Sequence, residues 1–169
     1  MHHLDAARDL SAARDLPSIA VVVRTVARAM TGAQGVTFVL REDGNCFYAD
    51  EDAIAPLWKG QRFPLSTCIS GWAMLNDATA VIPDITLDPR IPQAAYRPTF
   101  VRSLAMVPVG SPLPVAAIGA YWSRARRPPA AAVAALQQIA ALTATAMNRI
   151  DLTTAPWAPN FALHPTPAD

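Results

Sequence analysis

The sequence predicts an α+β fold, in which a central antiparallel sheet of about six strands has the N- and C-terminal helices packed on one face. The chain has 169 residues, which corresponds to one domain at roughly 100–200 residues per domain. Apolar residues recur at helical spacing near both ends and form short strand-like runs between them. Charged residues make up 16% and hydrophobic residues 52% of the chain, the opposite of the balance that keeps a chain disordered.

The first third of the chain predicts two helical segments and a hairpin. Residues 1–16 are rich in Ala, Arg and Asp and predict an N-terminal helical extension. Pro17 suits the first position of a new helix, which opens the main domain, residues 17–152, and ends at Gly32. The β-branched and aromatic run 36–40 and the run 46–48 flank an Asp-Gly-Asn turn, so they predict a β-hairpin.

The middle of the chain predicts short elements separated by connections. After a mixed connection, residues 62–65 form a short extended piece, and Ser66 or Thr67 can cap a helix over residues 69–75. Residues 80–82 predict a strand that Pro83 stops. The Pro-punctuated stretch 84–99 predicts a long loop with one helical turn, and such a loop in a compact domain usually serves a function.

The last third predicts a second hairpin and a long helix. Residues 102–109 and 115–122 are the longest strand candidates, with Gly110 and Pro112 in the turn between them. Pro128-Pro129 opens a final helix that extends to Ile150. Residues 153–169 are Pro-rich and predict a flexible tail.

The distribution of chemically active residues excludes several kinds of site. The three histidines, His2, His3 and His164, all lie at the chain ends, so a histidine-based catalytic site, haem or zinc would need a tail to reach it. The only cysteines, Cys46 and Cys68, match no CxxC pattern. Glycine-rich nucleotide-binding loops are also missing.

Charge and hydropathy set expectations about partners and location. The net charge is +1, which gives no general attraction to nucleic acid or to acidic lipid. The longest apolar runs are shorter than the ~20 residues that span a bilayer, and the first residues lack the apolar region of a signal peptide. We therefore expect a cytoplasmic domain with neither a nucleic-acid nor a membrane partner.

Four segments, in order, resemble a GAF domain. They are TGAQGVTF (31–38), CISGWA (68–73), VIPDI (81–85) and RSLAMVPV (102–109). The resemblance covers residues 15–152 and is strongest to the GAF modules of bacterial sensor histidine kinases and related signalling proteins. It implies the α+β fold described above, and says little about a ligand because a fold carries no function by itself.

The resemblance also implies a small-molecule pocket between one sheet face and the segments 66–76 and 84–100. The implied ligand-binding residues are Cys68, Trp72, Asp84, Tyr96, Arg97, Phe100 and Arg102. Apolar walls with a few polar groups are typical of ligand sites. Structural roles remain open: Trp72 and Phe100 as core residues, Asp84 as a turn cap, and Arg102 as a surface residue or ion-pair partner.

Comparison with the family's known ligands leaves the cofactor unidentified. Covalent bilin attachment, as in phytochromes, needs a cysteine in the region that here spans residues 85–105, which contains neither Cys nor His. Haem-binding members need an axial ligand, usually His. The Asn-Lys-x-Asp signature of cyclic-nucleotide GAF domains is missing, because the only lysine, Lys59, follows Trp58. We therefore expect neither haem nor covalent bilin.

The leading functional interpretation is a non-enzymatic sensory domain that binds a small molecule or transmits a signal through its terminal helices. In the GAF domains of signalling proteins that this chain resembles, such helices usually continue into a dimer, so the resemblance implies a homodimer and an output domain such as a histidine kinase. The candidate interface residues are Val22, Val26, Met30, Leu136, Thr143, Met147 and Ile150.

Two alternatives remain open. One is a redox enzyme of the free methionine sulfoxide reductase type, acting through Cys68 and Cys46. In that branch a cysteine precedes the glycine that matches Gly71, where this chain has Ser70, and the residues beside Cys68 supply no electropositive setting. The other alternative is a dimerisation module without a ligand.

Overall fold

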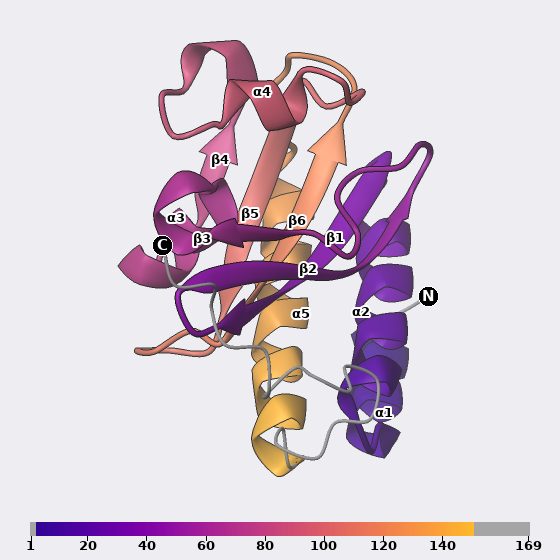
Figure 1. Cartoon of the computed structure of the whole chain (residues 1–169). Helices are drawn as coiled ribbons and strands as arrows, with labels where there is room; N and C mark the ends of the chain where they lie inside the picture. Colours follow the sequence, from indigo (N-terminus) through magenta and orange to yellow (C-terminus); the bar gives the residue numbers. More distant parts are fainter. Residues whose placement is uncertain (1–2, 151–169) are drawn as a thin grey trace.

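The computed structural model describes residues 3–150, with side chains from Asp5 onward, as a six-stranded sheet with helices on both faces (Figure 1). The strand order is β3-β2-β1-β6-β5-β4, and all neighbouring strands are antiparallel. The predicted α+β architecture and number of strands are therefore confirmed. The predicted tail, residues 153–169, lies outside the described residues.

The strands are β1 (Gly35–Glu42), β2 (Asn45–Ala53), β3 (Arg62–Pro64), β4 (Ala80–Ile82), β5 (Ser103–Val109) and β6 (Ala116–Trp122). The helices are α1 (His3–Ala12), α2 (Leu16–Thr31), α3 (Ile69–Asn76), α4 (Gln93–Tyr96) and α5 (Ala130–Arg149), with 3₁₀ turns η1 (Leu65–Thr67) and η2 (Ile85–Leu87).

One hydrophobic core lies between the sheet and the helices α1, α2 and α5. Strand side chains alternate between the two faces, so Phe38 and Leu40 of β1 point into this core while Val39 between them points to the other face. Ile19 and Val23 of α2 are fully buried here. These helices therefore form one continuous layer behind the sheet (Figure 1).

Most of the residues expected at a dimer interface belong to this core. Val26, Leu136, Thr143 and Met147 are buried within the monomer, and the Thr143 hydroxyl donates to the carbonyl of Ile139 in its own helix. These four side chains pack on the sheet, because the apolar stripe of each helix faces it. Val22, Met30 and Ile150 are half-buried at the margin of the core.

A second core fills the opposite face of the sheet, under α3, η2, α4 and the segment 54–61. It contains Cys46, Tyr48, Cys68, Tyr96 and Tyr121, together with aliphatic side chains from β4 and β5. This is the layer in which the sequence predicts a ligand pocket.

The starts of two helices differ from the prediction: α2 begins at Leu16, so Pro17 is its second residue, and α3 has a different cap. Asp15 caps α2 by accepting a hydrogen bond from the Ser18 N–H, and Gly32 ends that helix at φ 66°. Ser66 and Thr67 do not cap α3: they form η1, and Cys68, in an extended conformation, is the N-cap residue. The cause is the 3₁₀ turn, which places the entry to α3 after Thr67.

Helix α5 is long and apolar enough, by length and composition alone, to cross a membrane. The length of the uninterrupted apolar runs predicts no such segment; Gln137 and Gln138 interrupt the run in α5, yet the average hydropathy over the helix remains apolar. In the fold, 44% of the most apolar 18-residue stretch of α5 is buried, since α5 packs on the sheet beside α2. A core helix of a globular domain passes the same test of composition, so this is weak evidence for a membrane span.

Candidate functional site

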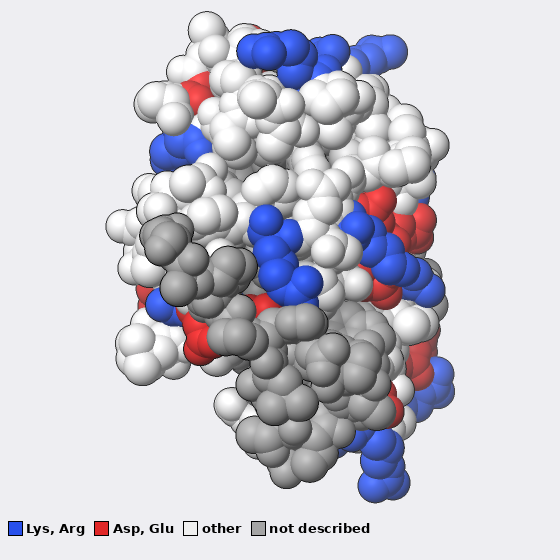
Figure 2. Space-filling model, in the orientation of Figure 1, with Lys and Arg blue, Asp and Glu red and all other residues white. Residues whose placement is uncertain are grey.

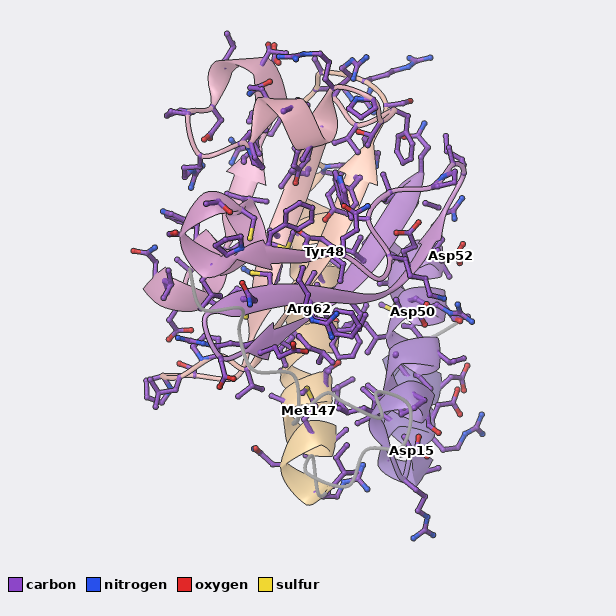
Figure 3. All side chains as sticks on the ribbon, in the orientation of Figure 1. Asp15, Tyr48, Asp50, Asp52, Arg62 and Met147 are labelled. Carbon is purple, nitrogen blue, oxygen red and sulfur yellow. The ribbon has the colours of Figure 1, made fainter. Side chains whose placement is uncertain are left out.

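Four aromatic rings form the centre of the second core. Trp58 contacts three tyrosines, with ring centroids 5.6 Å from Tyr48, 4.6 Å from Tyr96 and 5.4 Å from Tyr121. All four side chains are buried. Tyr48 comes from β2 and is labelled in Figure 3, Tyr121 comes from β6, and Tyr96 ends α4. We call these four residues the aromatic cluster.

A carboxylate fixes the backbone that carries Trp58. Glu51 of β2 accepts hydrogen bonds from the N–H groups of Leu57, Trp58 and Lys59 at 2.7–2.9 Å. The indole N–H of Trp58 donates to the carbonyl of Ala95, in α4, at 3.0 Å. The segment 54–61 is thus tied to β2 on one side and to α4 on the other.

The hydroxyl groups of the cluster differ in their partners. Tyr121 pairs with the Thr37 hydroxyl at 2.8 Å, and Tyr48 pairs with the Ser70 hydroxyl at 3.0 Å. Among the described residues, the Tyr96 hydroxyl is the one buried side-chain polar atom that has no hydrogen-bond partner. Burial raises the pKa of all three phenols above the ordinary value, so they are protonated and neutral at physiological pH.

A groove of about 420 Å³ opens beside the cluster. Trp58 belongs both to its wall and to the aromatic cluster, while Ala95, Pro98 and Thr99 line it on the α4 side. The other lining residues are Pro56, Leu57, Gln61, Phe63 and Ala94. None of these described residues that line the groove has a charged side chain. The groove therefore suits a small, largely apolar molecule.

The two cysteines meet in the same layer. The Sγ atoms of Cys46 and Cys68 are 3.1 Å apart, and both residues are buried free thiols. The Ser70 hydroxyl donates to the Cys68 sulfur at 3.4 Å. Cys46 and Tyr48 lie two residues apart on β2, so strand alternation puts both side chains on this face.

The two thiols have opposite pKa shifts. The hydrogen bond from Cys46 lowers the pKa of Cys68 to about 7, with further help from the Ser70 hydroxyl and the Gly71 N–H at the start of α3, against burial. The pKa of Cys46 is raised, first by its hydrogen bond with Cys68 and then by burial. The structure thus surrounds Cys68 with hydrogen-bond donors that lower its pKa, and the residues next to Cys68 in sequence do not reveal them.

The predicted ligand residues are only partly brought together. Tyr96 and Cys68 both lie in the second core, and Phe100 is half-buried beside it, near Gly35. Trp72 is also half-buried against this core, and its ring stacks under the guanidinium of Arg90 at 4.3 Å.

The predicted charged residues lie at the surface. The carboxylate of Asp84 accepts from the Thr86 N–H and hydroxyl, which is the turn-capping role left open above. Arg102 is exposed and donates to the carbonyls of Thr99 and Val101, and Arg97 is exposed. None of the three lines the groove.

Tyr48, Trp58 and Tyr121 are site residues that the sequence analysis missed. The alternation of side chains along a strand could have indicated two of them. Tyr48 lies two residues after Cys46 on β2, and Tyr121 lies four residues after Ala117 on β6, so each points to the same face as its strand neighbour. Trp58 lies in an irregular segment, and its position depends on the Glu51 hydrogen bonds, which no local pattern indicates.

Two other hollows occur on the surface of the described residues. One, of about 380 Å³, includes Arg124, Arg126 and Arg127 where β6 leads to α5. Figure 2 shows basic side chains at the upper end of the face in view. The other, of about 350 Å³, lies between α5 and the start of the β5–β6 turn. Within residues 3–150 no group of three or more His, Cys, Asp or Glu side chains could hold a metal.

Comparisons with known proteins identify the fold family. Residues 13–148 match the GAF_2 family of GAF domains. No curated protein matches the chain. Similar solved structures include a free methionine-R-sulfoxide reductase from Neisseria meningitidis in complex with its substrate, with a TM-score of 0.73 and 17% identity over 86% of each chain.

Two further similar structures come from signalling proteins. The GAF domain of a phosphoenolpyruvate-protein phosphotransferase from Coxiella burnetii has a TM-score of 0.73 and 14% identity over 86% of this chain and 92% of that chain. The GAF-B domain of DevS from Mycobacterium smegmatis has a TM-score of 0.64 and 16% identity over 78% and 92%. At these identities the likeness supports the fold, and together with the family match over most of its length it shows that this chain belongs to the GAF domain family.

Proposed function

We propose that this chain is a non-enzymatic sensory GAF domain that binds a small, largely apolar molecule non-covalently against the aromatic cluster. The observation that carries the proposal is the groove lined by Trp58, whose ring lies 4.6 Å from that of Tyr96, a residue behind the groove wall with a buried hydroxyl that has no partner. An unpaired buried hydroxyl costs about 1–3 kcal/mol. A ligand whose hydrogen-bond acceptor reaches past Trp58 to this hydroxyl would remove that cost.

The contacts around the groove support a route to the terminal helices. Lys59, next to Trp58, pairs with Asp50 at 3.1 Å, and Asp50 also pairs with Arg24 of α2 at 3.2 Å. Asp52 pairs with Arg28 of α2 at 2.8 Å. Figure 3 shows Asp50 and Asp52 on the side of the sheet nearest α2. A ligand that moves Trp58 would therefore act on α2 through continuous polar contacts.

The output would pass through these helices. We propose a homodimer formed by the outer faces of the terminal helices and coupled to an output domain such as a histidine kinase. The bacterial, cytoplasmic setting of this role is part of the proposal, as is the absence of nucleic-acid and membrane partners. Solved GAF domains from signalling proteins share the fold, which supports this assignment by analogy.

Ligand binding is tested by thermal shift and native mass spectrometry across a panel of small apolar metabolites. Binding at 100 times the dissociation constant adds about 2.7 kcal/mol to the free energy of unfolding, so Tm should rise by several degrees. Tyr96→Phe keeps the ring and removes the hydroxyl, and should weaken binding about tenfold. Trp122→Phe, remote from the groove, is the matched control.

If no compound shifts Tm and the protein carries no copurified molecule, the ligand-free dimerisation module is the better interpretation. If Tyr96→Phe and Trp122→Phe weaken binding equally, the ligand does not contact Tyr96. Either result would contradict the site proposed here.

The second candidate function is a redox enzyme that reduces a small thioether oxide. The 3.1 Å separation of the Cys46 and Cys68 sulfurs favours it, and a reductase for free methionine-R-sulfoxide shares the fold. Consumption of reductant with free methionine sulfoxide tests it directly. Turnover that Cys68→Ser abolishes would replace the non-enzymatic assignment.

A further inference from the structure

We propose that Cys46 and Cys68 form a two-electron oxidation site, in which a small hydroperoxide oxidises Cys68 and Cys46 then closes an intramolecular disulfide. This inference goes beyond the proposed function, because it needs neither the groove ligand nor catalytic turnover. It rests on the placement of the two sulfurs, on the donors that surround Cys68, and on the segment that the disulfide would enclose.

The two sulfurs are held from different elements. Cys46 lies on β2, with Arg41 of β1 and Phe63 of β3 as its register partners. Cys68 is the N-cap residue of α3. Their Sγ atoms are 3.1 Å apart, and a disulfide bond is 2.03–2.05 Å long, so about 1 Å of approach closes the bond.

The donors around the pair give each thiol a distinct role. Cys68 receives the Ser70 hydroxyl at 3.4 Å, and Ser70 in turn pairs with the Tyr48 hydroxyl at 3.0 Å. The N-terminal end of α3 also favours negative charge at this position. Cys68 is therefore the attacking thiolate, and the pKa of about 7 that its surroundings give it agrees with this role.

Cys46 is suited to the second step. The raised pKa of its thiol, caused first by its hydrogen bond with Cys68, keeps it protonated until Cys68 has been oxidised. Its sulfur is then already at contact distance from the sulfur that it must attack. The residue directly before Cys68, Thr67, is exposed, whereas the residue directly before Cys46, Asn45, is half-buried, so a small oxidant can approach more readily beside Cys68.

The chemistry balances with a hydroperoxide as the only oxidant. The Cys68 thiolate attacks the terminal oxygen, an S–O bond forms, the O–O bond breaks, and the alkoxide leaves as an alcohol after taking a proton from water. Cys46 then attacks the Cys68 sulfur, an S–S bond forms, the S–O bond breaks, and the hydroxide leaves with the Cys46 proton as water. Two thiols and one hydroperoxide give a disulfide, an alcohol and water.

The disulfide would enclose the segment that carries Trp58. The chain between Cys46 and Cys68 contains the rest of β2, the segment 54–61 and β3. Trp58 and Phe63 of this segment line the groove. Oxidation would therefore fix the wall of the groove against α3 and change the setting in which a ligand binds.

Intact-mass analysis of the full chain tests the proposal. The reduced protein is treated with hydrogen peroxide, quenched, and labelled with iodoacetamide after unfolding. Because these are the only two cysteines, loss of two hydrogens with no labelled thiol identifies the Cys46–Cys68 bond. Dithiothreitol should restore two labelled thiols. Cys46→Ser should stop at a sulfenic acid on Cys68, which dimedone traps, and Cys68→Ser should lose its thiol at least about tenfold more slowly.

Three outcomes would overturn the proposal. The first is a wild-type protein that keeps both thiols at a peroxide concentration that oxidises free cysteine. The second is a disulfide between two chains, seen as a dimer on a non-reducing gel. The third is a sulfenic acid that forms on Cys46 in Cys68→Ser as fast as on Cys68 in Cys46→Ser. The double variant measures the background of methionine oxidation.

Discussion

Gly71 lies in the first turn of α3, where its α carbon packs against the backbone carbonyl of Leu65 in η1. A Cβ at this position would overlap that carbonyl, which is backbone and cannot rotate away. Gly71→Ala should therefore lower the free energy of unfolding by about 2–3 kcal/mol or more, measured by urea denaturation. Gly44→Ala, where a Cβ meets no atom within 4 Å, should change it by less than about 0.5 kcal/mol.

Equal stability of the two alanine variants would contradict the close contact between η1 and α3. That contact matters for the cysteine pair, because η1 sets where α3 begins and hence where Cys68 lies.

Cys68 should show a thiolate titration well below that of an ordinary cysteine. Its pKa is lowered from 9.0 to about 7, so the alkylation rate should rise with pH through about 7. Cys46→Ala removes the largest stabilising donor and should move the midpoint to higher pH. Ser70→Ala removes a weaker donor and should move it less. The measurement is the rate of iodoacetamide labelling of the folded protein, and an unchanged midpoint in Cys46→Ala would reverse the assignment of roles.

At the residue scale, the sequence indicates Cys68 and Tyr96 but not the contacts that surround them in the fold. The hydrogen bonds that lower the Cys68 pKa come from Cys46, on another element, and from the first turn of α3. Asp84 was correctly given a possible capping role because an Asx turn is local. Trp58 was missed because its burial depends on contacts with Glu51 and with Ala95, which are made only in the folded chain.

The segment 54–61 is an element without regular secondary structure, and Glu51 holds it in place. Three N–H donors converge on this one carboxylate. Hydrogen bonds to a charged group contribute about 1.5–3 kcal/mol each, and they are not additive. Glu51→Ala should therefore destabilise the domain by about 2–4 kcal/mol and shift the fluorescence of buried Trp58 to longer wavelength.

Asp52→Ala is the matched control for Glu51→Ala. It removes a neighbouring carboxylate whose half-exposed pair with Arg28 contributes about 1 kcal/mol or less. Chemical denaturation gives the stability, and emission spectra of the folded variants report on Trp58. A Glu51→Ala spectrum identical to that of the wild type would mean that the segment is held by its side-chain packing instead.

At the element scale, most strands were predicted because their apolar runs are clear, and β4 was predicted at its observed bounds, residues 80–82. Strand β2 is longer than the predicted run 46–48, since it extends to Ala53 through Asp50, Glu51 and Asp52. Three acidic residues in succession suggest a connection. They remain in the sheet because Asp50 and Asp52 pair with basic residues of α2 and Glu51 receives three N–H groups.

On the scale of the whole molecule, the two ends of the described chain are joined. Ala6 and Leu10 of α1 are buried in the same core as α2 and α5, so the N-terminal extension is part of the packed domain. Arg149, in the last turn of α5, donates to the carbonyls of Leu10 and Ser11 at 2.7 and 2.8 Å. A displacement of α5 therefore acts directly on α1, a coupling that the sequence could not show because the residues lie 138–139 positions apart.

Because the apolar stripes of α2 and α5 are occupied by the sheet, the proposed dimer must use their outer faces. On α2 that face carries Ser18, Val21, Thr25 and Ala29, and on α5 it includes Ala134, Ala141 and Thr145. Val21 is 47% exposed, and the small residues around it allow close approach of a second helix.

Val21→Glu should then weaken self-association at least about tenfold, since it would bury an unpaired carboxylate at the contact. Val115→Glu changes a valine that is 40% exposed before β6, away from the terminal helices, and should leave association unchanged. Sedimentation velocity over a range of concentrations measures both. A wild-type protein that stays monomeric at high micromolar concentration, or equal loss of association in the two variants, would exclude an interface on these helices. The signal would then have to leave the domain through α1 and α5 of a single chain.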